Sequence, residues 1–445
     1  MDTERSVVSA ALTELAAACP AVREADPSAD RVAGVTPVFV ASPGSTEEAS
    51  ALLRAAAGYG LTVVPRGAGT GLSWGAPPSA CDLVVDMRRM DQVIEHAAGD
   101  LVARVQAGAT MGYLASVLAS AGQQLALDAP ADATVGGVVA TGTAGPRRFR
   151  YGAPRDLLIG ITVVRADGVI AHSGGKVVKN VAGYDLGKLF AGSQGTLGLI
   201  TEATFRLHPL PAAVAWVTAE FGPAERAGAA AAVAAAAGSA LVPTAVELDW
   251  PGGSQRPLRV GVLLEGTGPG VAERAKQMSE LLAAPGGAVS ASTVAVAETA
   301  PARWGVLPHS AIVVRVSFWL SSLRPVLDAL AGAGAAAGIR PAVSGPAGAG
   351  ALYACLDPGT SDADAVRFVT MLRDRVADAL GSAAPRGGVA VLAAPPAVLA
   401  ATWDKAVPGL ALMRAVRDQF DPDHRMFPGR GAGPAGRSPI HGGGD

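Results

Sequence analysis

The stretch Pro65-Arg66-Gly67-Ala68-Gly69-Thr70-Gly71-Leu72 decides the fold, because glycine occupies every second position from residue 67 to residue 71. Glycine tolerates backbone conformations that other residues avoid, so successive N–H groups can turn toward one point and bind an anion. We therefore expect a cradle for a phosphate or a pyrophosphate; a glycine-rich turn without a ligand is the alternative. Neither common nucleotide motif fits, because GxGxxG needs glycine where Leu72 stands, and Gly183 to Lys188 is one residue short of a P-loop.

Further glycine-rich runs follow this loop, and together they indicate an elongated ligand. They lie at residues 134–142, 145–152, 183–185 and 192–201. Turns alone do not explain so many glycine runs, so we expect close backbone approach to a long, thin molecule. A dinucleotide held between two lobes has that shape.

The segments before the first glycine loop predict a strand, a helix and a second strand. A short apolar run at 38–40 reads as a strand, and Ser45 followed by Glu48 is a capping-box pattern that starts a helix. The next strand, at 61–64, leads directly into the loop. Farther on, Gly136-Gly137 is expected to precede a small-residue helix at 138–143.

The second half of the chain has a plainer pattern. Pro209 to Pro211 indicates a domain boundary, and beyond it apolar strands such as 258–264 and 311–318 alternate with helices. This order favours a separate domain with an antiparallel sheet backed by helices. Arg315 interrupts one of these apolar strands; we expect an arginine on an edge strand, and contact with a substrate anion is the alternative.

The composition excludes several classes of protein. The chain has 445 residues, with 36 Lys or Arg against 38 Asp or Glu, so its charge gives no case for a nucleic-acid partner. The most apolar stretch, 227–243, is mostly alanine and glycine and predicts a buried helix rather than a transmembrane segment. Charged residues precede the apolar ones at the N-terminus, so we expect no secretory signal and a cytoplasmic location. Three scattered cysteines predict neither a disulfide set nor an iron–sulfur cluster, and the six histidines predict no metal site.

At its glycine-rich runs the sequence resembles the FAD-binding domain of the vanillyl-alcohol-oxidase (PCMH-type) flavoproteins, from Val38 to Leu210. Within that family it is most similar to the FAD-binding subunits of bacterial glycolate oxidases. The closer resemblance rests on Thr143 to Gly152, Gly175 to Asp185, Gly192 to Ile200 and the tail from Phe420 to Arg430. It implies an α+β fold with a two-lobed PCMH-type FAD-binding domain and an antiparallel-sheet α+β cap domain.

The resemblance also implies a division of the chain. We expect an N-terminal helical segment at 1–35, the FAD-binding domain at 36–210, the cap or substrate domain at 211–405, a segment at 406–430 that returns to the FAD-binding domain, and a disordered tail at 431–445.

The resemblance assigns the cofactor site residue by residue. The first glycine loop, beside Arg66, would bind the pyrophosphate, the run from Thr134 would line the ribityl chain and flavin, and Gly198 to Ile200 would meet the adenosine. The cofactor-binding residues expected in this way are Pro65, Arg66, Gly67, Ala68, Gly69, Thr70, Gly71, Leu72, Thr134, Val135, Gly136, Gly137, Ala140, Thr141, Gly145, Gly198, Leu199 and Ile200.

Two departures from the family pattern refine these expectations. Members with covalent flavin carry a histidine in the first glycine loop, which this chain lacks, so we expect non-covalent FAD. The hydroxy-acid dehydrogenases carry a histidine-rich metal-binding segment late in the chain, whereas the corresponding stretch here, 384–390, holds no ligand.

The resemblance implies an FAD-dependent oxidoreductase subunit that acts on CH–OH donors. Electrons would pass from a small 2-hydroxy acid through flavin to partners, which are a catalytic flavoprotein subunit and an iron–sulfur subunit; these could associate the chain with a membrane. A stand-alone dehydrogenase of another hydroxy acid or alcohol, and a non-catalytic assembly subunit, are the alternatives. Candidate catalytic residues are Arg147, which could hold a carboxylate, and Lys179 and Tyr184, which could act in proton transfer. Structural salt bridges and loop architecture are the alternative roles for these three.

Overall fold

The computed structural model describes residues 2–176, 183–252, 256–285, 290–302, 304–306, 310–381, 388–402 and 409–431. Lys179, most of the stretch 384–390 and all but the first residue of the predicted disordered tail therefore lie outside the described residues. Contacts divide the chain into two units. The first comprises Met1–Ala144, Ala153–Leu210 and Ala406–Asp445, and the second comprises Gly145–Gly152 and Pro211–Lys405.

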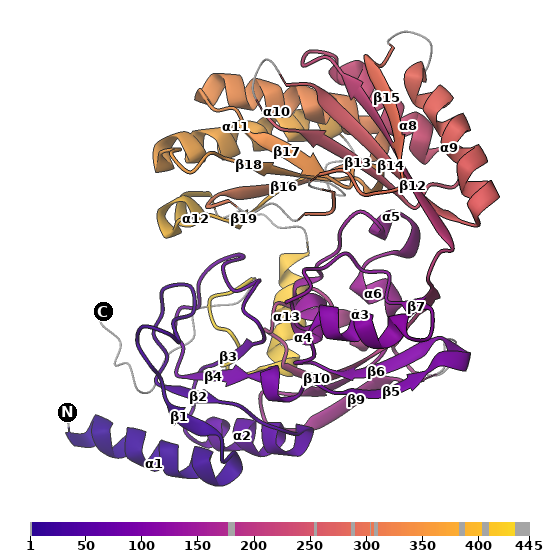
Figure 1. The fold of residues 1–445 in the computed structure, drawn as a ribbon. Helices are drawn as coiled ribbons and strands as arrows, with labels where there is room; N and C mark the ends of the chain where they lie inside the picture. The colour runs from indigo at the N-terminus through magenta and orange to yellow at the C-terminus, as the bar shows by residue number, and fades with distance from the viewer. Residues whose placement is uncertain are drawn as a thin grey trace. The chain divides into compact units, whose positions relative to one another are not determined.

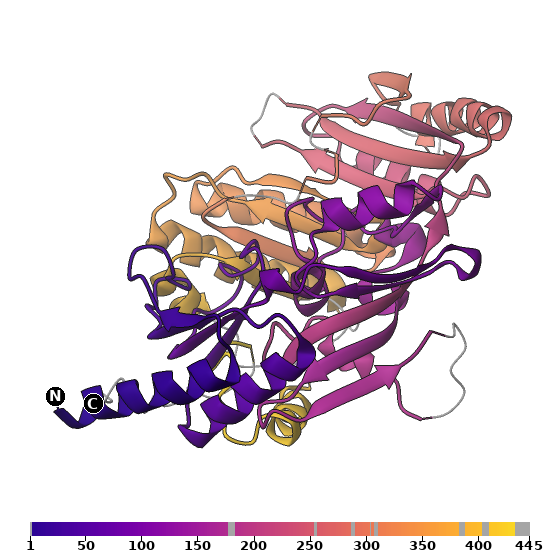
Figure 2. The same cartoon turned by 60° about the horizontal axis from the view of Figure 1, so that its bottom comes forward.

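The first unit begins with a small mixed sheet covered by two helices. Its strand order is β1-β2-β4-β3, and β2 and β3 both run parallel to β4. The helices α1 and α2 lie side by side (Figure 2) and pack their apolar residues against this sheet. The elements are α1 (Asp2–Ala18), β1 (Val22–Glu24), β2 (Phe39–Ala41), α2 (Thr46–Gly58), β3 (Val63–Arg66) and β4 (Leu83–Asp86).

A second sheet of the first unit has five antiparallel strands in the order β5-β6-β10-β8-β9. The helices α3 and α4 share one apolar core with this sheet. The strands are β5 (Val93–Ala97), β6 (Val102–Gln106), β8 (Leu158–Val164), β9 (Ile170–Gly174) and β10 (Leu199–Arg206), with a separate pair β7 (Gln123–Gln124) and β11 (His208–Pro209). The helices are α3 (Met111–Ala119), α4 (Val135–Thr141), α6 (Pro154–Leu157), α7 (Gly187–Phe190) and α13 (Leu410–Phe420).

The second unit is one antiparallel sheet of eight strands, in the order β15-β12-β14-β13-β17-β18-β16-β19. Helices α8 to α11 share a single apolar core with it (Figure 1). The strands are β12 (Ala213–Phe221), β13 (Ala245–Trp250), β14 (Leu258–Gly266), β15 (Thr293–Ala297), β16 (Val313–Ser317), β17 (Ala342–Gly345), β18 (Ala351–Cys355) and β19 (Gly388–Ala393). The helices are α5 (Arg148–Tyr151), α8 (Arg226–Ala237), α9 (Gly268–Ala283), α10 (Leu323–Ala337), α11 (Asp362–Leu380) and α12 (Pro396–Thr402).

The segment 145–152 packs with the second unit although it lies within the sequence of the first. Phe149 lies against Gly348, where a side chain would come within 3.2 Å of the phenyl ring. The hydroxyl of Tyr151 donates a 2.7 Å hydrogen bond to the buried Glu265. Both contacts join residues far apart in the sequence, so local patterns do not indicate them.

The predicted α+β fold, with a two-lobed first part and an antiparallel second part, is confirmed. At residue level two expectations were wrong. The helix expected at 138–143 is α4, which begins at Val135 because the side chain of Thr134 caps it. Arg315 is not on an edge strand, since β16 lies between β18 and β19. No helix in the described part of the chain combines the length and the apolar character needed to span a membrane.

Candidate cofactor site

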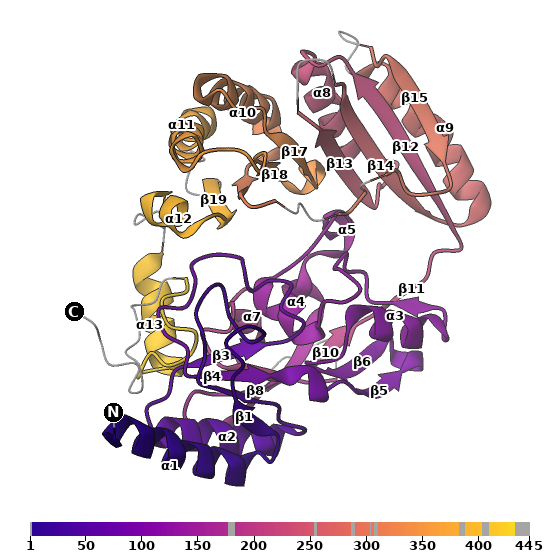
Figure 3. The ribbon, with the colours of Figure 1, turned by 60° about the vertical axis from the view of Figure 1, so that its left-hand side comes forward.

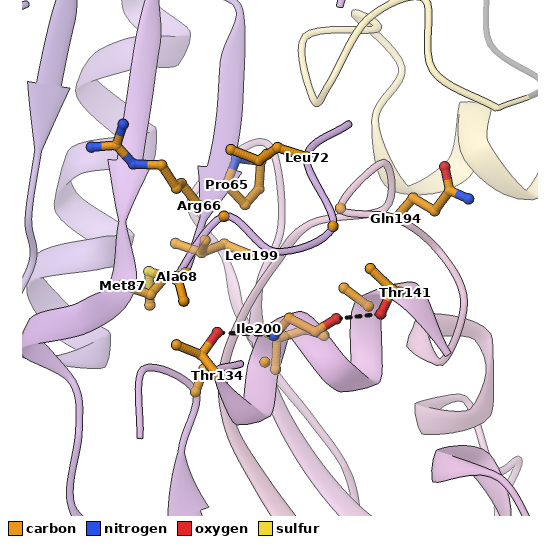
Figure 4. Close-up of a pocket in the computed structure, with 18 of the residues that line it drawn as sticks. Pro65, Arg66, Ala68, Leu72, Met87, Thr134, Thr141, Gln194, Leu199 and Ile200 are labelled. Carbon is orange, nitrogen blue, oxygen red and sulfur yellow. Dashed lines mark hydrogen bonds between the residues drawn. The ribbon is translucent and has the colours of Figure 1, made fainter. Parts of the chain in front are cut away.

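A pocket of about 730 Å³, which includes space open to solvent, lies wholly within the first unit. It is bordered by the loop after β3, by α4 and by the turn before β10 (Figure 4). The lining residues are Pro65, Arg66, Gly67, Ala68, Gly69, Thr70, Gly71, Leu72, Met87, Ala107, Thr134, Gly136, Gly137, Ala140, Thr141, Gln194, Gly195, Gly198, Leu199, Ile200, Phe427 and Arg430.

The loop after β3 lines this pocket and carries backbone donors without a protein partner among the described residues. The strand pairs in parallel with β4 up to Arg66, and the glycines then take the chain out of the sheet. Gly69 has φ +84°, a conformation that favours glycine. Within the described residues, the N–H groups of 68–71 donate to no other protein group, whereas that of Leu72 donates to the carbonyl of Gly69. Free, clustered N–H groups of this kind are suited to an anion.

The same loop packs directly on α4. A Cβ atom on Gly67 would lie 2.0 Å from Thr134 Oγ1, and one on Gly71 would lie 2.7 Å from Thr141 Cγ2. The Thr141 hydroxyl donates to the carbonyl of Gly137 at 2.8 Å, so its methyl group is held toward the loop. These glycines are therefore required for close approach and not only for turning.

The third side of the pocket is the turn 194–200. Gly195 has φ +77° and lies against the ring of Pro65, and Gly198 has φ +150° beside the carbonyl of Val164. The N–H group of Gln194 donates to the carbonyl of Ala140 at 2.7 Å, which ties this turn to α4. Three segments that are distant in sequence thus meet with little side-chain volume between them.

The positive charge of Arg66 is already shared between two carboxylates. Its Nη2 lies 3.0 Å from Asp86 and 3.4 Å from Asp30, and all three side chains are nearly buried. In Figure 4 its guanidinium points away from the wall formed by Thr141 and Gln194. Hydrogen bonds from Arg23, stronger than the opposing effect of burial, hold the pKa of Asp30 far below its usual value. Burial alone would raise the pKa of Asp86, but hydrogen bonds from Arg88 lower it overall, so both partners of Arg66 remain negatively charged at neutral pH.

The C-terminal segment supplies two further lining residues. Phe427 and Arg430 line the pocket, and the guanidinium of Arg430 stacks over the Phe427 ring at 4.1 Å from its centroid. The N–H group of Phe427 donates to Val63 and that of Val63 donates to Arg425, so this segment pairs alongside β3. Figure 3 shows the segment after α13 beside the strands of the first unit.

Of the cofactor-binding residues predicted from the sequence, all but two line the pocket. Val135, the first residue of α4, is fully buried in the core that this helix shares with the five-stranded sheet, and Gly145 belongs to the second unit. Met87, Ala107, Gln194, Gly195, Phe427 and Arg430 also line the pocket and were not in the predicted set. Gln194, Gly195 and the two C-terminal residues lie in runs that the sequence had marked, whereas Met87 and Ala107 gave no signal.

The predicted catalytic residues are not brought into this pocket. Tyr184 is 91% exposed and does not line it. Arg147 belongs to the second unit, and Lys179 lies outside the described residues. Among the described residues, no group of three or more His, Cys, Asp or Glu side chains is placed to hold a metal ion.

The site fits an anionic nucleotide: it offers backbone N–H groups that bond to no other protein group, the guanidinium of Arg430, and glycines that leave room for close backbone approach. Comparison with known proteins agrees. Residues 37–174 match the family model described as FAD binding domain. Residues 37–174 contain an FAD-binding domain, and FAD is the cofactor.

The sequence is also similar to several proteins of known name. The chain is 40% identical over 178 residues to a probable mitochondrial D-lactate dehydrogenase from Danio rerio, covering 39% of this chain and 36% of that protein. It is 39% identical over 181 residues to glycolate oxidase subunit GlcD from Bacillus subtilis, covering 39% and 38%. It is 37% identical over 177 residues to a D-2-hydroxyglutarate dehydrogenase from Xanthomonas citri, covering 39% and 38%. The matches thus span less than two fifths of these relatives.

The whole fold is also found in solved structures. The fold matches p-cresol methylhydroxylase with substrate bound at a TM-score of 0.73 and 14% identity, over 96% of this chain and 97% of that one. It matches a 4-ethylphenol oxidase from Gulosibacter chungangensis at 0.72 and 16% identity, over 96% and 98%. At these identities the likeness shows the fold alone.

Proposed function

We propose that the protein is an FAD-dependent oxidoreductase that oxidises the CH–OH group of a small 2-hydroxy acid. The observation that carries this proposal is the cofactor pocket: most of its walls come from residues 37–174, which match the FAD binding domain model. The chain is also 37–40% identical over 177–181 residues to proteins named as hydroxy-acid dehydrogenases or a glycolate oxidase subunit. The glycine loop, α4 and the turn 194–200 would hold FAD without a covalent bond. No histidine, cysteine or tyrosine is among the lining residues in the described part of the chain, which supports this last point.

Such a reaction needs a hydride acceptor, groups that bind the cofactor and a base that takes the hydroxyl proton. Bound FAD supplies a hydride acceptor. The described lining residues of the pocket would bind and orient FAD. None of them is a carboxylate, histidine, lysine or tyrosine that could take the hydroxyl proton of the substrate. The base must therefore come from elsewhere, and Lys179 and Tyr184 stay as candidates for it.

Two arginines of the second unit are candidates for holding the carboxylate of the substrate. Arg147 was predicted for this role from the sequence. Arg315 lies on the interior strand β16, and its Nε is buried without a hydrogen-bond partner among the described residues. A guanidinium in this state is suited to bidentate binding of a carboxylate.

We propose further that electrons leave through partner proteins, as in a glycolate oxidase-like complex with a catalytic flavoprotein subunit and an iron–sulfur subunit. The likeness to the GlcD subunit supports this. The chain itself has three cysteines, of which Cys19 and Cys81 are buried in two different apolar clusters, so an iron–sulfur cluster would belong to another chain. Any association with a membrane would then come through those partners.

Two other functions stay open. The relatives named D-lactate dehydrogenase favour a stand-alone enzyme. A non-catalytic assembly subunit is the third possibility, which the sequence departures in the stretch 384–390 favour.

Anaerobic reduction of the purified chain separates these functions. A yellow protein that glycolate or D-lactate bleaches without partners is the stand-alone dehydrogenase. A yellow protein that is bleached only after addition of its partner subunits is the subunit of a complex. A protein that binds FAD and is bleached in neither case contradicts the proposed oxidation. Denaturation should release all of the flavin into the supernatant, since we expect no covalent bond.

A further inference from the structure

Arg430 lies in the cofactor pocket with its guanidinium almost completely buried. Only 2% of the residue is exposed. Its Nη2 donates to the carbonyl of Leu72 at 2.6 Å, its Nε donates to the carbonyl of Ala76 at 3.1 Å, and its Nη1 lies 3.5 Å from the carbonyl of Gly71. Its hydrogen bonds therefore hold the far end of the glycine loop.

The charge of Arg430 has no neutralising partner. All of its acceptors are carbonyls, and no ion pair joins it to a carboxylate of the described residues. Burial lowers the pKa of Arg430 to about 10, which still leaves the group positively charged at neutral pH. Burying a charge without a counter-ion costs free energy, and a bound anion would offset that cost at Arg430.

Arg66 is in the opposite state. Its guanidinium is shared between Asp30 and Asp86, both nearly buried. The sequence pointed to Arg66 as the cation for the pyrophosphate, but an anion there would meet two carboxylates as well. Of the two arginines that line the pocket, Arg430 is the one whose charge is uncompensated.

The C-terminal segment is built to keep Arg430 in place. Arg417 donates to the carbonyls of Met426 and Arg430, both within 3.1 Å. Phe427 is held at φ +43°, a conformation that is rare for residues other than glycine. Such strain persists only where the surroundings fix the backbone, and it is concentrated at functional sites.

We propose that Arg430 supplies the positive charge that binds the diphosphate of FAD, and that the segment 421–430 is thereby part of the cofactor site. The role of Arg430 is distinct from the oxidation proposed above, because it concerns retention of FAD whichever substrate is used. The guanidinium both orients the loop through its carbonyls and offsets the charge of the diphosphate.

The test is a titration of the full-length apoprotein with FAD at several salt concentrations. The quenching of flavin fluorescence reports how much FAD is bound. Arg430→Met should weaken FAD binding by about tenfold to hundredfold, the range expected for one charge-assisted hydrogen-bonding group. Riboflavin, which lacks the diphosphate, should bind this variant and the unsubstituted protein equally. Arg430→Lys keeps the charge and should lose less affinity for FAD than Arg430→Met. The salt dependence of FAD binding should be weaker in Arg430→Met than in Arg430→Lys or in the unsubstituted protein.

Thermal unfolding separates this role from a merely structural one. The rise in melting temperature on adding FAD should become smaller in Arg430→Met, whereas a merely structural role would lower the melting temperature of the apoprotein and leave that rise unchanged. Arg373→Met, in α11 of the second unit, is the control, since this arginine also donates to a backbone carbonyl, that of Thr402, and does not line the pocket. Unchanged FAD affinity in Arg430→Met would overturn the proposal. So would an equal loss of FAD and riboflavin binding with an unchanged salt dependence. If Arg430→Met does not fold, Arg430→Gln takes its place, because it removes the charge and keeps hydrogen-bond donors; FAD affinity and salt dependence equal to those of the unsubstituted protein would overturn the proposal.

Discussion

A Cβ atom on Gly67 would lie 2.0 Å from Oγ1 of Thr134, which caps α4. Real Cβ atoms do not come that close, so Gly67→Ala must push the glycine loop away from the helix. Because the pocket is bordered by both, we expect the variant to be purified with much less FAD. The ratio of flavin absorbance to protein absorbance measures this directly.

Gly99→Ala is the control for that variant. Gly99 also lies in the first unit, has an ordinary φ, and has no atom within 4 Å of a Cβ built on it. It should retain its flavin in full. Equal flavin content in the two variants would show that the loop can shift without loss of the site.

Gly69 allows the charge of the cradle to be tested without changing its shape. It has φ +84°, which asparagine and aspartate tolerate better than most residues. Gly69→Asp and Gly69→Asn introduce side chains of the same size, so only the charge differs. If the free N–H groups of 68–71 face a diphosphate, the aspartate variant should bind FAD at least tenfold more weakly than the asparagine variant. Titration calorimetry of the two apoproteins gives that ratio, and equal affinities would contradict a diphosphate at this loop.

Local signals made much of this site predictable. Alternate glycines at 67, 69 and 71 mark the loop, and the capping pattern that begins with Ser45 marks α2, whose first turn the Ser45 side chain caps. Such signals act between residues near in sequence, and the structure agrees with them. The start of α4 at Val135 was placed too late, at residue 138, because two adjacent glycines usually oppose a helix. Here packing overrides that preference, since a Cβ on Gly136 would lie 2.7 Å from Ala107.

The rest of the site depends on contacts across long stretches of chain. Arg430 reaches Leu72 over a separation of 358 residues, and no periodicity or spacing announces such a contact. The same holds for the segment 145–152, whose glycines suggested a cofactor loop. In the structure its Tyr151 is bonded to Glu265 in the second unit.

Asp30 should make the stability of the first unit sensitive to acid. Its pKa in the folded protein lies below the usual value of 3.8, chiefly because Arg23 donates hydrogen bonds to it. A lowered pKa contributes stability that is complete above about pH 4 and is lost as the pH falls below that value. Asp30→Asn should therefore cost about 1–2 kcal/mol at pH 7, at the lower end because Arg23 is half exposed.

Urea unfolding at a series of pH values checks this prediction. The difference in unfolding free energy between the unsubstituted protein and Asp30→Asn should shrink as the pH falls from 5 toward 3. Asp378→Asn, at an exposed position of α11, serves as the control and should show no such trend. A difference that stays constant with pH would mean that the ion pairs of Asp30 contribute nothing to stability.

Asp421 should determine whether the C-terminal segment docks at all. It is fully buried, and its carboxylate accepts hydrogen bonds from the backbone N–H groups of Arg425 at 3.0 Å and Met426 at 2.8 Å. Asp421→Ala leaves both donors without that partner, which should cost about 2–4 kcal/mol and loosen the turn that leads to Arg430. The neighbouring Asp423 has a side chain that is 75% exposed, so Asp423→Ala should change stability by less than about 0.5 kcal/mol. Hydrogen exchange of the Phe427 and Val63 amides, which bond across this junction, should accelerate in Asp421→Ala and stay slow in Asp423→Ala. Equal protection in the two variants would show that the segment is held by its arginines and apolar contacts without the aspartate.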